Sequence, residues 1–261
     1  TYLSNPLTTE IILYDGIPRI EFKTIIEARE TGRRFRVVFP LNVENGRLYV
    51  DKPFNIEEIK SSEEVYVGSV RSNGKMGRVF GAYSWADLSS KDYGVTLISR
   101  QNAGFILEDN KLSSILLSTV NPDSLGRFRK CPTLIGLGKY VFEYALYPHK
   151  GNVYRGEVYK RAQEYLNPLI ALANLEGNGN LPPSYSFLRI EPSNLVLSAL
   201  FKEKEEIVLR IFEIEGKDTK LHLEFFKTLE NMHVTNFLGE TLENSKPLMF
   251  KKHEIKEIRA T

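Results

Sequence analysis

The chain has 261 residues, with 35 Lys and Arg against 33 Asp and Glu, which gives a formal charge of +2. This near-neutral balance offers no electrostatic reason to expect nucleic acid or an anionic membrane as a partner. No apolar run approaches the roughly 20 residues that span a bilayer. The one cysteine, Cys131, excludes an internal disulfide and permits a reducing compartment, so we expect a cytoplasmic protein.

Short strand patterns separated by turn residues follow one another along the first half of the chain. Asp15-Gly16-Ile17-Pro18 predicts a turn between strands at 11–14 and 19–23. Asn45-Gly46 predicts a hairpin that joins 41–43 to 48–50. Further strands are expected at 34–40, 64–70, 79–83, 93–99, 104–107 and 111–120.

The segment 139–147 alternates most regularly, with Tyr140, Phe142, Tyr144 and Leu146 on one side of a predicted strand. Residues 154–166 show helical spacing, and Pro168 is expected to end the helix. After a loop at 176–184, short charged strands are expected at 195–201, 207–213 and 220–226. The sequence therefore predicts an all-β protein with one domain over 1–181 and a small sandwich over 182–261.

Four phrases in the middle of the chain carry a family resemblance. They are Trp85-Ala86-Asp87-Leu88-Ser89, Tyr93-Gly94-Val95-Thr96-Leu97-Ile98, Tyr144-Ala145-Leu146-Tyr147-Pro148-His149-Lys150-Gly151 and Glu164-Tyr165-Leu166-Asn167-Pro168-Leu169. Together with weaker matches at 11–22, 34–41 and 186–200, this order resembles the C-terminal β-sandwich region of α-mannosidases of glycoside hydrolase family 38.

The resemblance implies an N-terminally incomplete antiparallel supersandwich of the galactose-mutarotase type, followed by a small C-terminal β-sandwich. In that family the catalytic carboxylate and zinc belong to an N-terminal barrel, and no segment here shows the alternating strands and helices of such a barrel. We therefore expect this chain alone to be inactive and without a cofactor, with zinc in the missing catalytic domain. The implied partners are that domain of the same polypeptide and α-mannoside glycans. An unpaired sheet edge could also favour a homo-oligomer.

Candidate site residues are few. The four histidines form no HxH or HxxxH pair, and His222-x-Glu224 is interpreted as a solvated strand face, so no metal site is predicted. Trp85 could stack on a sugar, although packing is the more ordinary role of a lone tryptophan. His149 could face a ligand or be a hydrogen-bonded residue at a strand end.

The basic loop at 121–130 is a further candidate for contact with substrate. Asp123, Arg127 and Arg129 could hydrogen-bond sugar hydroxyls, or they could form an exposed hairpin tip. The resemblance favours the first role, because relatives carry acidic and arginine residues near this place, facing the active-site cleft.

The first functional hypothesis is a non-catalytic β region that supports a retaining, zinc-assisted α-mannosidase and contributes to the wall of its sugar cleft. A stand-alone carbohydrate-binding β module is the second. The third is a structural or protein-interaction sandwich, because fold alone does not fix function.

Overall fold

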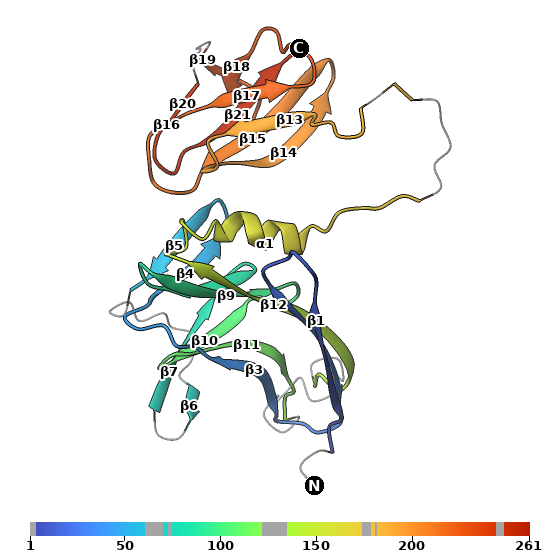
Figure 1. Ribbon diagram of the computed structural model, residues 1–261, viewed down its shortest axis with the longest axis vertical. Helices are drawn as coiled ribbons and strands as arrows, with labels where there is room; N and C mark the ends of the chain where they lie inside the picture. The colour runs from blue at the N-terminus through green and yellow to red at the C-terminus, as the bar shows by residue number, and fades with distance from the viewer. Residues whose placement is uncertain are drawn as a thin grey trace. The chain divides into compact units, whose positions relative to one another are not determined.

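The computed structural model describes residues 4–60, 70–72, 75–121, 135–173, 179–180, 182–243 and 248–261. Within these residues the chain is built from antiparallel strands and one helix, which confirms the predicted all-β class (Figure 1). Two compact units are present, one formed by Thr1–Lys52 and Glu57–Leu169, the other by Pro53–Ile56 and Ile170–Thr261. The predicted domain boundary at 181/182 stays a prediction, because no described strand or helix lies between 167 and 187.

The first unit contains two sheets, apart from the first two residues of the edge strand at 55–59, which are grouped with the second unit. In spatial order the seven-stranded sheet is β1 (Leu7–Leu13), β2 (Ile20–Ala28), β12 (Gly138–Lys150), β9 (Tyr93–Ser99), β8 (Trp85–Ser89), β4 (Arg47–Lys52) and β5 (Asn55–Ile59). The five-stranded sheet is β3 (Arg34–Pro40), β11 (Lys111–Ser118), β10 (Gly104–Glu108), β7 (Lys75–Gly81) and β6 (Val70–Ser72). Their facing side chains form one core, so this unit is a sandwich.

The helix α1 (Val158–Leu166) lies on the other face of the seven-stranded sheet (Figure 1). On β12, Tyr140, Phe142 and Tyr144 point into the sandwich core, as the alternation predicts. The alternate residues of β8, β9 and β12 therefore face α1 and the loop that leads into it. This outer face is also buried, because Trp85 and Ile98 are fully inaccessible to solvent.

The edge strand β1 leaves apolar side chains exposed. Leu7, Ile11 and Leu13 pair in register with Ile26, Phe22 and Ile20 of β2. Ile26 and Phe22 belong to the sandwich core, and directly opposed residues share a face, so the β1 side chains extend the inner face of the sheet. They are nevertheless 49%, 66% and 71% exposed, in that order. Among the described residues, nothing in the second sheet covers this end of the inner face.

The second unit is a smaller sandwich. Its five-stranded sheet is β14 (Leu195–Glu203), β15 (Glu206–Glu213), β21 (Ile255–Ala260), β18 (His233–Thr235) and β19 (Thr241–Glu243). Two ribbons accompany it, β13 (Leu188–Glu191) with β17 (His222–Phe225), and β16 (Thr219–Lys220) with β20 (Met249–Phe250). Side chains of the sheet and of both ribbons share one core, which agrees with the predicted small β-sandwich.

Two local predictions were wrong. Asn45 does occupy a turn with a positive φ of 52°, but 41–43 is not a strand paired with β4. Instead this segment crosses from β3 in one sheet to β4 in the other, and Val43 is buried in the core between them. The helix also begins at Val158 and not near Tyr154, because backbone turns occupy the residues between.

Candidate functional site

The four phrases that carry the family resemblance meet in one place. The first three form β8, β9 and the end of β12, which are neighbours in the seven-stranded sheet, and the fourth forms the end of α1. In the sheet register, Gly94 of β9 lies opposite Ser89 on one side and His149 on the other. Segments up to about 80 residues apart in sequence therefore build a single region, which makes it the first candidate for a functional site.

A buried polar cluster lies at the centre of this region. Asp87 of β8 is completely buried. Its carboxylate accepts hydrogen bonds from Ser89 Oγ at 2.5 Å, Thr96 Oγ1 at 2.7 Å and His149 Nε2 at 2.8 Å. A carboxylate only accepts, so the imidazole tautomer with its proton on Nε2 makes this contact. The cluster connects β8, β9 and β12 through side chains as well as through their backbones.

Backbone groups close the space around His149. A Cβ atom at Gly156 would overlap the imidazole at Nδ1, and one at Gly94 would overlap its other edge. The Tyr147 ring stacks on the imidazole with centroids 5.5 Å apart, and its hydroxyl donates to the Gly156 carbonyl at 2.9 Å. His149 Nδ1 is buried and has no hydrogen-bond partner in the described part of the chain.

The Asp87–His149 pair has the residue types of a general acid–base dyad but lacks the access that the chemistry needs. In such a dyad the second imidazole nitrogen must come within hydrogen-bond reach of a reacting group. Here that nitrogen faces Gly156, at a distance that only glycine allows. The pair therefore fixes the strand arrangement. A ligand-facing role for His149 would require this packing to open, and it stays a prediction.

Trp85 is fixed by a second buried carboxylate. Asp51 of β4 accepts hydrogen bonds from the backbone nitrogens of Ser84 and Trp85 and from the Ser84 hydroxyl. Burial raises the pKa of Asp51 above its ordinary value, although these donors oppose the effect. The Trp85 side chain itself is fully buried, so no ring face is open to a sugar in this arrangement. A sugar contact at Trp85 likewise stays a prediction.

Asp123, Arg127 and Arg129 lie outside the described residues, as does Cys131. The distance of these three loop candidates from the Asp87 cluster is therefore not given by the described residues. Their contact with substrate remains a prediction from the sequence alone.

An arginine pair that sequence reasoning did not identify holds the end of α1. Arg100 follows β9 and donates from Nη2 to the Tyr165 carbonyl at 2.8 Å. Tyr165 lies in the last turn of α1, where the carbonyls have no hydrogen-bond partner within the helix. Its guanidinium carbon lies 4.5 Å from the centre of the Tyr165 ring, and that of Arg19 lies 5.3 Å from it. Burial raises the pKa of the Tyr165 hydroxyl. The ring is thus a buried, un-ionised group in contact with two cations.

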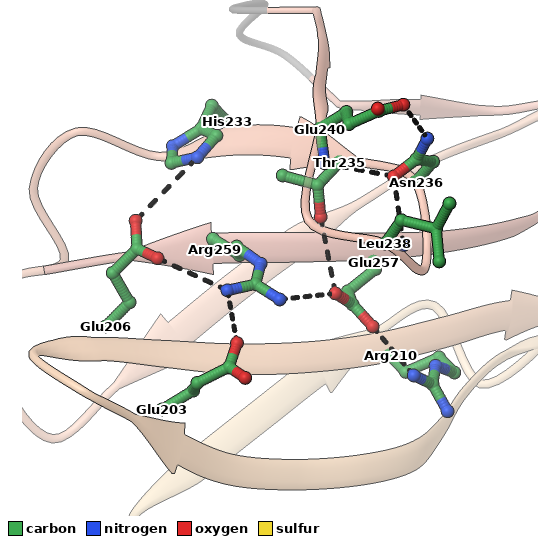
Figure 2. Close-up of polar contacts among 10 residues, drawn as sticks. All are labelled: Glu203, Glu206, Arg210, His233, Thr235, Asn236, Leu238, Glu240, Glu257 and Arg259. Carbon is green, nitrogen blue, oxygen red and sulfur yellow. Dashed lines mark hydrogen bonds and ion pairs between the residues drawn. The ribbon is translucent and has the colours of Figure 1, made fainter.

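The second unit contains an ion network on β14, β15, β18 and β21 (Figure 2). Buried Glu257 accepts from Arg210 at 2.7 Å and from Arg259 at 3.1 Å. Arg259 also donates to Glu203 and Glu206, as Figure 2 shows. Burial acts to raise the pKa of Glu257, but the hydrogen bonds and charges of both arginines outweigh it and hold that pKa below its ordinary value. This network ties the four strands together around a central carboxylate that is buried from solvent.

A further buried carboxylate, Glu213, holds two loops of the second unit. Its donors are the Asn194 side chain and the backbone nitrogens of Glu215, Gly216, Lys217 and His253. Burial acts to raise the pKa of Glu213, but these donors outweigh it and lower that pKa. The buried carboxylates of the described residues are thus Asp51, Asp87, Glu213 and Glu257, and each is held by structural donors.

No group of three or more His, Cys, Asp or Glu side chains suited to a metal ion occurs within the described ranges. The residues that can be placed therefore do not fit a zinc site. In the same part of the chain, no helix has both the length and the apolar character needed to cross a membrane.

Comparison with known proteins agrees with the architecture. Residues 2–124 match the glycosyl hydrolases family 38 C-terminal domain, and residues 194–256 match the C-terminal beta sandwich domain of the same family. The two sandwiches and these matches define the chain as a β-sandwich region of a glycoside hydrolase. It belongs to family 38, as part of the C-terminal region.

Named relatives are similar over most of this chain. Alpha-mannosidase 2C1 of Mus musculus is 26% identical over 226 residues, covering 83% of this chain and 20% of that protein. The Homo sapiens protein of the same name is 25% identical, with the same coverage. An alpha-mannosidase structure from Enterococcus faecalis V583 covers 97% of this chain and 28% of its own, with a TM-score of 0.76 and 18% identity. The chain thus spans about a fifth of the length of the two alpha-mannosidase 2C1 proteins.

Proposed function

We propose that this chain is the non-catalytic C-terminal β region of an α-mannosidase. Its role is to scaffold a catalytic domain of the same polypeptide and to form part of the wall of the sugar cleft. The observation that carries the proposal is that each buried carboxylate of the described residues is held by structural donors. Glycoside hydrolysis needs two carboxyl groups facing the scissile bond, and none of these four is open to a substrate.

Zinc in this proposal belongs to the part of the polypeptide that carries the catalytic carboxylates. A catalytic zinc site needs three protein ligands and one open position, and the described residues offer no such set. Two of the four described histidines also have other surroundings, since His149 bonds Asp87, and His233 bonds the Asn231 carbonyl. What this chain contributes is a rigid support, in which the Asp87 cluster and Arg100 fix β8, β9, β12 and α1 to each other.

The names of the relatives support α-mannosides as the substrate class of the whole enzyme. Cytoplasmic location also remains part of the proposal, together with a retaining mechanism. The loop residues Asp123, Arg127 and Arg129 are the candidates for the cleft wall, because arginine and carboxylate groups hydrogen-bond sugar hydroxyls.

The full-length parent tests this function. We expect it to hydrolyse an aryl α-mannoside, to release the α-anomer first, as followed by proton NMR, and to lose activity when zinc is chelated. Substituting Arg127 by Ala in the parent should raise KM if the loop reaches the sugar, while Arg29→Ala, an exposed arginine on another loop, should not. A folded parent without α-mannosidase activity would contradict the proposal.

A further inference from the structure

The ribbon β13–β17 of the second unit has two unlike faces. Leu188 and Ile190 of β13, with Leu223 and Phe225 of β17, pack against the core of this unit. Because side chains alternate along a strand, the residues between them point to solvent. These outward residues are Arg189, Glu191, His222 and Glu224, and all four are exposed.

Three aromatic rings continue this outward face at one end of the ribbon. Tyr185, Phe187 and Phe226 are 46%, 55% and 47% exposed. The ring centroids of Tyr185 and Phe187 lie 5.1 Å apart, and those of Phe187 and Phe226 lie 5.4 Å apart. We refer to these three residues as the aromatic surface. Exposed rings in mutual contact are costly to leave in water, so a contiguous set of this kind indicates a binding surface.

The backbone beneath the aromatic surface is fixed. The Phe226 nitrogen donates to the Phe187 carbonyl at 2.9 Å, which extends the pairing of the ribbon by one step. Phe225, whose ring centroid lies 4.8 Å from that of Phe226, is anchored in the core. The Ser186 hydroxyl donates to the Leu188 carbonyl at 3.0 Å. The rings are therefore held in place before any ligand arrives, which lowers the entropic cost of binding.

Polar groups stand beside the rings on the same face. Arg189 Nη2 lies 2.6 Å from Glu191 Oε1, and Arg189 Nη1 lies 4.0 Å from Glu224 Oε2. The Arg189 side chain is 61% exposed. Its guanidinium has five N–H donors, more than these two contacts use, and the carboxylates retain acceptor positions toward solvent. The face thus combines an apolar aromatic part with donors and acceptors held a short distance away.

We propose that the outward face of the β13–β17 ribbon binds a pyranoside. One face of a pyranose ring presents C–H groups that stack on aromatic rings, while its hydroxyls both donate and accept hydrogen bonds. The aromatic surface matches the first property, and Arg189 with Glu191 and Glu224 matches the second. A purely apolar partner would leave this polar row desolvated and unpaired. The ligand class, α-mannoside glycans, rests on the proposed function, but the binding itself needs no catalytic domain.

Calorimetric titration of the full 261-residue chain with mannobiose tests this inference. We expect weak, saturable binding by the wild-type chain. Phe187→Leu keeps an apolar side chain at this position but removes the ring, and should weaken binding by about tenfold. Phe237→Leu is the matched control, because Phe237 is a similarly exposed aromatic of the same unit at 59% exposure. It should bind as the wild type does.

Arg189→Gln provides a second variant on an exposed side chain, in case Phe187→Leu perturbs folding. It should weaken mannobiose binding several-fold while the circular dichroism spectrum is unchanged. Absence of saturable binding by the wild-type chain would overturn the inference, as would two variants that both bind as tightly as Phe237→Leu. It is also overturned if Phe187→Leu reduces self-association and leaves glycan binding unchanged, since the rings would then form a protein contact. Activity of the parent on an aryl mannoside is a separate readout, so either proposal can fail without the other.

Discussion

Replacing Asp87 by Asn should destabilise the first unit without changing its shape. Asp87 accepts three buried hydrogen bonds, from Ser89, Thr96 and His149. An asparagine keeps one acceptor oxygen and turns an NH₂ group toward donors that need an acceptor. At least one buried donor is then left unpaired, at a cost of about 1–3 kcal/mol, and the other contacts to a charged acceptor are weakened.

The expected loss is therefore about 3 kcal/mol of unfolding free energy, which corresponds to a melting temperature lower by about 6–12 °C for a unit of this size. Trp85 is the only tryptophan of the chain and is buried two residues before Asp87. Its fluorescence during urea or thermal unfolding thus reports the first unit selectively.

Asp92→Asn serves as the control, because Asp92 is an exposed acid on the turn between β8 and β9. It removes the same charge from the same part of the sheet and should change stability by less than about 0.5 kcal/mol. Unfolding of Asp87→Asn at the same urea concentration as Asp92→Asn would show that the cluster does not hold these strands together.

Three further outcomes are expected. Gly156→Ala should lower the unfolding free energy of the first unit by about 1–3 kcal/mol in the same fluorescence assay, because the new Cβ would overlap the His149 ring. An unchanged urea midpoint would show that the loop before α1 can move to make room for the methyl group. Because the pKa of Glu213 is lowered in the folded state, the unfolded chain binds this proton more readily, and the second unit should lose stability as pH falls from 4.5 through the folded pKa. Glu213→Gln should flatten this pH dependence of stability, as measured by circular dichroism. Parallel stability curves for the variant and the wild type would contradict this role of Glu213. The chain should associate as its concentration rises, and Ile11→Lys with Leu13→Lys should reduce this in light scattering; a clean monomer at all concentrations would contradict it.

Much of the fold was predictable because strand periodicity and turn residues are local signals. The strands 34–40 and 93–99 have the bounds that their patterns predict, and the two faces of β12 follow from its alternation. The hairpin at Asn45-Gly46 was mispredicted because a turn residue fixes the backbone of the turn and not the partner of the next strand. Val43 is instead buried between two sheets, which is a tertiary effect.

The Asp87 cluster could be predicted only in part. Its residues all lie in the phrases that resemble the family, and His149 was identified as a candidate. Asp87 and His149 are 62 positions apart, however, and their contact depends on the register of β8, β9 and β12, which no local pattern specifies. The aromatic surface was missed for the same reason, since Phe187 and Phe226 meet only through the pairing of β13 with β17.

The proposed role of this chain is to support an α-mannosidase without carrying catalytic groups of its own. The most direct test is the rate of aryl α-mannoside hydrolysis by this chain alone, compared at equal molar concentration with the full-length parent, both in the presence of zinc. We expect turnover by the parent and none above the buffer rate by the chain. Hydrolysis by the chain alone that disappears on unfolding and withstands further purification would contradict the claim, and would locate catalytic groups in this region.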